Sequence, residues 1–194
     1  MITQAFNAPN LITLVRVLLA PVAVVAILKE RPTTALTVFA IAAATDFLDG
    51  LLARATGAST RTGQYLDPIA DKVLLCAVYV ALWVARTVPG WFVAVVFGRD
   101  AALLLGSAIA MRFTTYDNYR PTLWGKISTF WQIAAAVTAM SADAMGARKS
   151  NLVRYAVYVA AAFTLWSAAH YAWRGMTFFR RLNTTGERIL SVNR

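Results

Sequence analysis

Long apolar stretches alternate with short polar segments along the whole chain. Each stretch predicts a helix, and the six cover approximately residues 9–28, 33–54, 66–86, 89–112, 122–143 and 151–173. A helix needs roughly 20 apolar residues to cross the hydrocarbon core of a bilayer, and every stretch comes near that length. We therefore predict an all-α fold, a single integral membrane domain of six transmembrane helices over residues 1–194, with 174–194 as a cytoplasmic tail.

Composition supports a membrane setting over a nucleic-acid partner. Hydrophobic residues make up 59% of the chain and charged residues 14%, whereas soluble proteins carry about a quarter charged residues. The net charge of +10 comes from short polar segments and the tail, with no basic stripe interleaved with aromatics. A membrane protein that faces anionic lipids and substrates also carries an excess of positive charge. We therefore expect no nucleic-acid partner. Cys76 is the only cysteine, which rules out a disulfide framework.

The polar segments also predict an orientation. With six spans, both termini lie on one side, and that side receives ten basic residues: Arg54, Arg61, Arg112, Arg120, Lys126, Arg174, Arg180, Arg181, Arg188 and Arg194. The opposite side receives six: Lys29, Arg31, Arg86, Arg148, Lys149 and Arg154. Because basic loops stay in the cytoplasm, we expect cytoplasmic termini and a location in the inner membrane of the cell.

Four of the nine acidic residues crowd into one short region. Asp46 and Asp49 lie three positions apart on the second predicted helix, and Asp67 and Asp71 lie four apart on the third. Each pair shares a helix face. A short connection makes the two helices antiparallel neighbours, so the four carboxylates can converge on one pocket near the cytoplasmic ends.

Three explanations are open for carboxylates at a membrane edge, where uncompensated charge is costly. They can form ion pairs with Arg54, Arg61 and Lys72, line a proton or cation pathway, or hold divalent cations through oxygen ligands. The neighbouring residues favour the third. Gly50 and Ala53 let a ligand approach the helix, and Arg54 can form a fork with phosphate oxygens. This combination is typical of metal-assisted phosphoryl chemistry.

The motif of residues 46–71 as a whole resembles a known signature. It reads Asp46-x2-Asp49-Gly50-x2-Ala53-Arg54-x8-Gly63-x3-Asp67-x3-Asp71. This is similar to the signature of the CDP-alcohol phosphotransferase family, with every fixed position filled. The resemblance covers nearly the whole chain and includes Pro9-Asn10-Leu11-Ile12-Thr13, Arg16, Pro21, Arg99-Asp100, Gly125-Lys126 and Thr129.

The resemblance implies a six-helix homodimer with a cytoplasm-facing metal site open to lipid. It implies that Asp46, Asp49 and Asp67 hold two ions, Mg²⁺ or Mn²⁺. Asp71 would touch a metal and act as general base on the acceptor hydroxyl. The CDP-lipid site would be lined by Asp46, Gly50, Ala53, Arg54, Gly63 and Asp67.

Within the family, the chain resembles the phosphatidylglycerophosphate synthases and the CMP-forming cardiolipin synthases, which implies CDP-diacylglycerol as donor. Members that use glycerol-3-phosphate commonly carry Arg-Glu, a further arginine and Gly-Lys-x-Lys-Thr. Here the corresponding positions hold Arg99-Asp100, Ser107 and Gly125-Lys126-Ile127-Ser128-Thr129. Two expected cations are therefore missing, which favours phosphatidylglycerol, whose phosphodiester carries less charge. Glycerol-3-phosphate stays the alternative acceptor, because Arg112 and Arg120 can supply the missing charge.

Two of the candidate acceptor ligands, Arg99 and Lys126, also have simpler explanations. Arg99 is either half of a buried pair with Asp100 or an acceptor contact, since an arginine in an apolar helix needs a partner. Lys126 follows a polar loop, where a lysine among lipid headgroups is ordinary. Arg112 and Arg120 complete the acceptor candidates.

Two functions outside the family also cluster aspartates on membrane helices. Polyprenyl transferases bind a diphosphate through Mg²⁺, but they usually have more helices and two separate acidic motifs, whereas this sequence has one composite motif. A cation or proton transporter can use four aspartates but has no need of Arg54 beside them. Release of CMP from a CDP-lipid separates the phosphotransferase from both.

Overall fold

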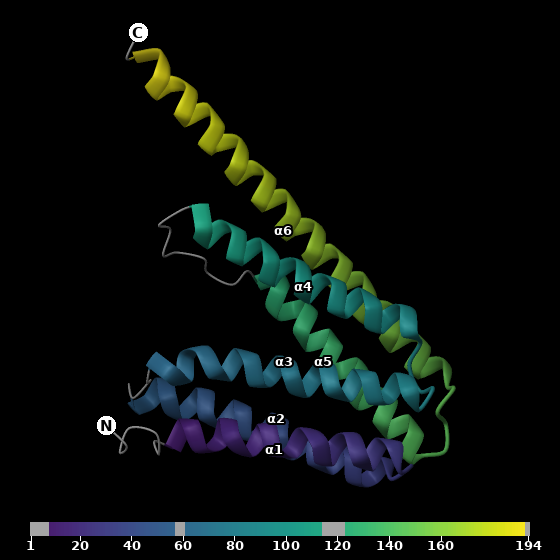
Figure 1. Ribbon diagram of the computed structural model, residues 1–194. Coiled ribbons are helices and arrows are strands. Elements are labelled where there is room, and N and C mark those ends of the chain that lie inside the picture. The colour runs from purple at the N-terminus through teal and green to yellow at the C-terminus, as the bar shows by residue number, and fades with distance from the viewer. Residues whose placement is uncertain (1–7, 57–60, 114–122, 193–194) are drawn as a thin grey trace.

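Helices joined by short turns make up the part of the chain that its structure, a computed structural model, describes. Backbone is described for residues 8–56, 61–113 and 123–192, and side chains for residues 18–45, 72–106 and 123–177. Six helices and no strand occur in these ranges (Figure 1): α1 Ala8–Leu28, α2 Pro32–Thr56, α3 Arg61–Val84, α4 Gly90–Phe113, α5 Leu123–Ala144 and α6 Asn151–Val192. The prediction of an all-α fold of six helices is confirmed.

Two helix ends differ from the predicted ones. The third helix was expected near residue 66 but begins at Arg61, so Gly63 lies in its first turn rather than in the connection. The sixth helix was expected to end near residue 173, yet α6 continues to Val192 and extends beyond the other helices (Figure 1). Residues 174–192 are polar but contain no proline. Hydropathy locates the end of the apolar face, whereas a helix ends where a breaker or cap occurs.

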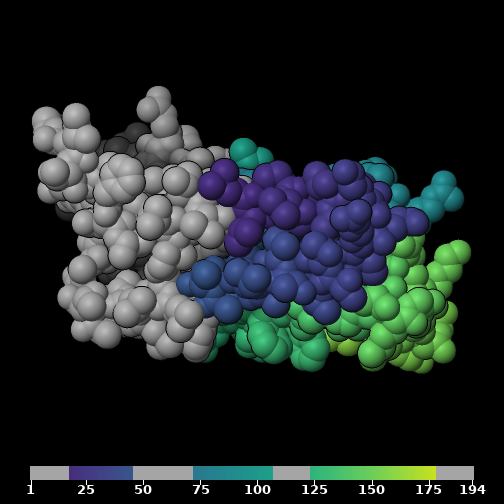
Figure 2. Space-filling view, turned by 90° about the horizontal axis from the view of Figure 1, so that it is seen from below, coloured from purple at the N-terminus to yellow at the C-terminus, as the bar shows by residue number. Residues whose placement is uncertain are grey.

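The helices form two groups that meet through α2, α3 and α5. Helix α1 packs against both α2 and α3, and α6 packs against both α4 and α5. Contacts of α5 with α2 and α3, and of α3 with α4, join the groups. Figure 2 shows α1 and α2 together along one side of the molecule, with α5 and the start of α6 at the end where α1 turns into α2.

Small side chains allow the helices to approach each other closely. Alanine is the commonest residue of the buried core and occurs in α1, α2, α3, α5 and α6. Small residues at helix contacts are the usual means of packing helices in lipid, where apolar burial gives no driving force for association. The larger buried residues, Tyr79, Leu82 and Phe92, fill the region where α3 meets α4.

A buried polar cluster joins α5 to α6 inside this core. The side-chain amide of Gln132 donates to the hydroxyl of Thr164 at 3.0 Å, and the Ser128 hydroxyl lies 3.3 Å from the same oxygen. Tyr79 of α3 donates to the backbone carbonyl of Gln132. Because polar groups in an apolar core cost free energy unless they are paired, these bonds favour one alignment of the three helices.

Large apolar side chains also point outward from every helix. They include Val22, Ile41, Val80, Leu104, Phe130 and Leu165. Among the described side chains, one segment, Asn151–Thr177, is long and apolar enough to cross a membrane. Shorter apolar segments occupy Leu18–Leu28, Pro32–Thr45 and Lys72–Val84, each bordering residues whose side chains are not described.

Helices α1, α3 and α5 end in the same way at the same end of the bundle. Each is followed by a residue in the left-handed region, with φ of 54° at Glu30, 57° at Arg86 and 69° at Gly146. The next backbone N–H reaches back to a carbonyl of the last turn in each case: Arg31 to Ala26 at 2.9 Å, Thr87 to Leu82 at 2.9 Å and Ala147 to Ala142 at 2.7 Å. This pattern satisfies carbonyls that a helix end leaves unpaired.

Arg148 holds these three helix ends together. Its guanidinium donates to both carboxylate oxygens of Asp143 in α5, at 2.7 and 3.2 Å, and to the Ala85 carbonyl after α3 at 3.2 Å. Glu30, after α1, lies 3.6 Å away. The hydrogen bond to Asp143 raises the pKa of Arg148. A cation here also complements the negative ends of the helix dipoles.

We expect Arg148→Met to lower the free energy of unfolding by roughly 1–3 kcal/mol, because it removes charge-assisted hydrogen bonds at the ends of α3 and α5 and an ion pair with Glu30 after α1. Thermal and denaturant unfolding of the purified protein in detergent measures the loss. The matched control is Lys149→Met, which removes the same charge from an exposed neighbour and should change stability by less than about 0.5 kcal/mol. Equal losses in the two variants would contradict the role of Arg148.

Candidate active site

The acidic motif lies on two consecutive helices, as predicted. Asp46 and Asp49 belong to α2, and Asp67 and Asp71 to α3, so their spacings of three and four residues are helical spacings. The two helices run antiparallel (Figure 1), and residues 57–60 connect them. Five peptide links from residue 56 to residue 61 reach at most about 18 Å, which keeps the two motif-bearing ends together. The four side chains themselves lie outside the described residues.

The remaining predicted nucleotide-site residues follow the same helices. Gly50, Ala53 and Arg54 lie in the last turns of α2, and Gly63 lies in the first turn of α3. Their side-chain surroundings are outside the described residues, as are those of Arg112 near the end of α4. Arg120 falls between α4 and α5, in a segment outside the described backbone.

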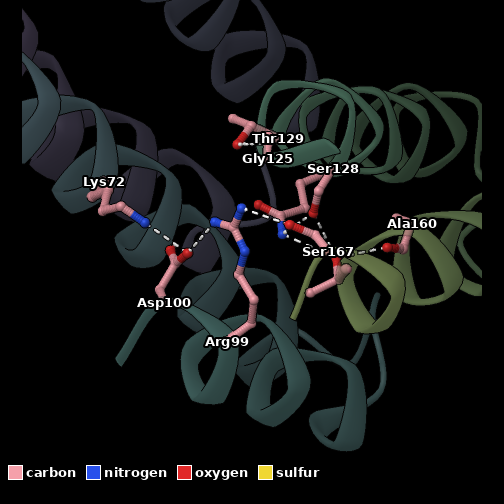
Figure 3. A network of polar contacts seen from close by, with 10 residues as sticks. Lys72, Arg99, Asp100, Gly125, Ser128, Thr129, Ala160 and Ser167 are labelled. Carbon is pink, nitrogen blue, oxygen red and sulfur yellow. Dashed lines mark hydrogen bonds and ion pairs between the residues drawn. The ribbon is translucent and has the colours of Figure 1, made fainter. Parts of the chain in front are cut away.

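An ion-pair cluster begins one residue after the motif. Lys72 of α3 places its Nζ 2.6 Å from a carboxylate oxygen of Asp100 in α4, and a guanidinium nitrogen of Arg99 lies 2.7 Å from the same oxygen (Figure 3). Asp100 and Arg99 are buried, while the Lys72 side chain is 39% exposed. The carboxylate of Asp100 thus forms ion pairs with two cations. The cluster of Lys72, Arg99 and Asp100 carries a net charge of +1.

Arg99 extends this cluster to α6. Its second terminal nitrogen donates to the Ser167 hydroxyl at 3.1 Å (Figure 3), and Ser167 is fully buried. Its Nε is buried and has no hydrogen-bond partner among the residues that the structure describes. Of the two explanations for Arg99, the buried pair with Asp100 is confirmed, and the contact with an acceptor stays a prediction. The unpaired Nε of Arg99 is available to donate a hydrogen bond to the acceptor substrate.

The cluster also reaches the start of α5, where Lys126 lies. A Cβ added at Gly125 would come within 3.3 Å of the Arg99 guanidinium and 3.0 Å of the Tyr171 hydroxyl. Only glycine allows this approach without displacing a neighbour. Lys126 follows directly and is exposed. The structure therefore brings Arg99 and the backbone beside Lys126 together, although the two are distant in sequence.

Sequence reasoning missed the partners of Arg99. Lys72 was considered as a counter-ion for the four clustered aspartates, but its described partner is Asp100. Ser167 was not singled out at all. One signal was present: Asp100 is the sole acidic residue of its apolar stretch, and a buried carboxylate requires cations from neighbouring helices.

The donor set of the motif fits divalent metal ions. Four carboxylates supply hard oxygen ligands of the kind that Mg²⁺ and Mn²⁺ bind, and their backbone positions place them at one end of two linked helices. No group of three or more His, Cys, Asp or Glu gathers among the described side chains. In the sequence, Asp46, Asp49, Asp67 and Asp71 place four of the nine acidic residues within 26 positions.

We expect Asp100→Asn to destabilise the fold by roughly 3 kcal/mol, because Lys72 and Arg99 lose their shared counter-charge. Unfolding in detergent checks this. Asp100→Glu, which keeps the charge, should recover most of the stability. Glu30→Gln, at an exposed carboxylate 3.6 Å from its partner, is the control and should cost less than about 0.5 kcal/mol. A fully stable Asp100→Asn protein would contradict the structural role of the cluster.

Comparison with known proteins extends over most of the chain. Residues 6–167 match the family model of CDP-alcohol phosphatidyltransferase. The chain is 30% identical over 182 residues to the CMP-forming cardiolipin synthase of Rattus norvegicus, covering 85% of this chain but 60% of that protein. It is 32% identical over 173 residues to the CDP-diacylglycerol–glycerol-3-phosphate 3-phosphatidyltransferase of Salmonella choleraesuis (strain SC-B67), covering 86% of this chain and 93% of that protein.

The protein of the same name from Escherichia coli (strain K12) is 31% identical, with the same coverage. The family match includes the whole acidic motif, Arg99, Asp100 and Lys126. It favours the phosphotransferase over a polyprenyl transferase or an ion transporter. The chain therefore belongs to the CDP-alcohol phosphatidyltransferase family of enzymes.

Proposed function

We propose that the protein works as an integral membrane enzyme whose six helices all span the bilayer. Two observations support this: large apolar side chains face outward from every helix, and the buried core is rich in alanine and contains a hydrogen-bonded polar cluster between α5 and α6. An exterior with many exposed apolar side chains is stable in lipid and unfavourable in water. The excess of basic residues on the side of the termini puts both termini, and the motif-bearing ends of α2 and α3, on the cytoplasmic side of the inner membrane.

The proposed reaction is phosphatidyl transfer from CDP-diacylglycerol to a glycerol-based acceptor. The oxygen of the acceptor hydroxyl bonds to the phosphorus that carries the diacylglycerol, and the bond from that phosphorus to CMP breaks. Asp71 takes the hydroxyl proton, and CMP leaves with the bonding electrons. The position of Asp71 supports this role, because the next residue, Lys72, is tied to α4 through Asp100 and orients this turn of α3.

Asp46, Asp49, Asp67 and Asp71 are proposed to hold two Mg²⁺ or Mn²⁺ ions. When bound, these ions supply Lewis-acid stabilisation of the diphosphate charge and of the departing CMP. Asp46 and Asp67 also belong to the proposed CDP-lipid site. There Gly50, Ala53 and Gly63 let the diphosphate approach the helices, and Arg54 donates to its oxygens.

Phosphatidylglycerol is the proposed acceptor, which makes the enzyme a CMP-forming cardiolipin synthase. The observation that carries this choice is Asp100, which offsets one of the two charges of Lys72 and Arg99. The remaining charge of +1 balances a phosphodiester, which carries a single negative charge. Arg99 Nε, buried without a described partner, is the proposed donor from this cluster to the acceptor phosphate. Lys126 is exposed, so solvent screens its charge, and it is the second proposed donor.

Glycerol-3-phosphate is the second candidate acceptor. The two bacterial relatives named for that acceptor match over 93% of their own length, whereas the rat cardiolipin synthase matches over 60%. A phosphomonoester carries more negative charge than the net +1 of Lys72, Arg99 and Asp100 can balance. Arg112 and Arg120 would then contribute the additional cations. A homodimer, implied by the family resemblance, is part of either proposal.

We expect Asp71→Asn to reduce CMP release from CDP-diacylglycerol at least about 100-fold, since a general base contributes that much or more to rate. Chelation by EDTA should abolish release, and added Mg²⁺ or Mn²⁺ should restore it. Chromatographic assay of CMP with purified protein and a glycerol-based acceptor measures both effects. Glu30→Gln, at the opposite end of the bundle, should retain full activity. Activity that survives EDTA would contradict the metal proposal.

The product lipid distinguishes the two acceptors. Mass spectrometry of separate reactions with phosphatidylglycerol and with glycerol-3-phosphate should detect cardiolipin in the first and no phosphatidylglycerophosphate in the second, because the Asp100 cluster balances one negative charge. Phosphatidylglycerophosphate without cardiolipin would reverse the choice of acceptor and leave the family reaction intact. Lys126→Gln should raise the KM for phosphatidylglycerol and leave the KM for CDP-diacylglycerol unchanged.

A further inference from the structure

A pocket lies at the end of the bundle opposite to the acidic motif. Its volume is about 290 Å³, and it is formed by the turn between α3 and α4, the connection between α5 and α6, and the first turns of α6. Thr87, Arg148, Lys149 and Arg154 are among the residues that line it. Ligand pockets commonly measure roughly 300 to 1,000 Å³, so this pocket accommodates a headgroup-sized ligand rather than a whole lipid.

The surroundings of the pocket are strongly basic. The segments at this end of the bundle contain six basic residues and two acidic ones, Glu30 and Asp143. Both acids lie within 4 Å of Arg148. Lys149 has no ion-pair partner among the described residues, and the partner of Arg154 is the neutral side chain of Asn151, at 2.9 Å. Two cationic side chains at the pocket therefore lack a described counter-charge.

The first turn of α6 adds donors to the same place. Ser150 caps the helix, because its hydroxyl accepts a hydrogen bond from the Val153 N–H at 3.3 Å, and Ser150 itself lines the pocket. The N-terminal end of a helix carries partial positive charge and attracts anions. The N-terminus of α6 and the basic side chains thus favour the same charge of ligand.

Thr87 provides an independent sign of a missing partner. Its side chain is 6% exposed and lines the pocket, and its hydroxyl has no hydrogen-bond partner among the residues that the structure describes. A buried hydroxyl left unpaired costs free energy. Thr87 thus brings an unpaired hydroxyl donor to the wall of the pocket.

Aromatic side chains at the rim indicate that the ligand also has an apolar part. Trp91 of α4 and Tyr158 of α6 stack with ring centroids 5.7 Å apart and are 45% and 57% exposed. Both line the pocket. Exposed tryptophan and tyrosine are enriched where the headgroups of a bilayer meet its hydrocarbon core. A free phosphate ion would gain nothing from this pair.

We propose that this pocket binds the headgroup phosphate of an anionic phospholipid, with Lys149, Arg154, Thr87 and the α6 N-terminus as donors and the acyl chains lying against Trp91 and Tyr158. The lipid comes from the leaflet opposite to the active site and is not consumed. The proposal rests on the membrane setting proposed above, but not on the choice of acceptor. It assigns a binding function to residues that the transferase reaction does not use.

The test measures lipid binding to the purified full-length protein by native mass spectrometry. Phosphatidylserine is the probe, because it is anionic and is neither the proposed donor nor a proposed acceptor. Lys149→Gln combined with Arg154→Gln should weaken its binding at least about tenfold. The matched control, Lys29→Gln combined with Arg31→Gln, removes the same charge from the same end of the bundle but outside the pocket, and should change binding less than about twofold. Phosphatidylcholine should bind weakly to all three proteins.

A second variant tests the site without a change of charge. Thr87→Val removes the unpaired hydroxyl, so the lipid-free protein should unfold at the same or a higher temperature, while stabilisation by added phosphatidylserine should fall. CMP release measured on every preparation should stay at the unmodified level, which separates failure at this site from failure of the proposed reaction.

Three outcomes would overturn the proposal. Equal weakening by the two double variants would mean a diffuse charge effect rather than a site. Equal binding of phosphatidylcholine would remove the anionic preference. Displacement of phosphatidylserine by millimolar inorganic phosphate would identify the occupant as free phosphate instead of a lipid.

Discussion

A charged side chain inside an apolar helix bundle must find its counter-charge within the protein, and Asp100 meets this requirement for α3 and α4 together. Its carboxylate pairs with Lys72 and Arg99, and Arg99 continues to Ser167 of α6. Outside the protein such pairs would compete with water, but in an apolar setting each broken bond leaves a costly unpaired group. Helices α3, α4 and α6 are therefore held in one alignment next to Asp71, which is the proposed general base.

The two ends of the bundle use their charged residues differently. One end carries the four aspartates of the motif on α2 and α3. At the other, α1, α3 and α5 all present their carbonyl ends, and Arg148 gathers them through Asp143, Ala85 and Glu30. Helix dipoles account for the preference for cations at carbonyl ends. Arg148 thus offsets carbonyl ends at the second end, while metal ions, in the proposal, offset the four aspartates at the motif end.

The same arrangement explains why some residues could be interpreted from sequence and others could not. The aspartate motif, its spacing and its helices were predicted because all its members are close in sequence and helical geometry relates them directly. Arg99 allowed two interpretations because its partner Ser167 lies on another helix, 68 positions away. The continuation of α6 to Val192 was not predicted, because the apolar pattern stops while helix-compatible residues continue.

The sequence by itself determined the number of helices, most of their approximate ends, the family and the concentration of metal-type ligands in one motif. These features depend on hydropathy, local backbone preference and short spacing, which a linear pattern contains. Only the tertiary structure decided which charges pair across helices, that Gly125 brings α5 against Arg99, and that three helix ends share Arg148. Each of these depends on distances between residues remote in sequence, and such distances are set by packing, which no local pattern encodes.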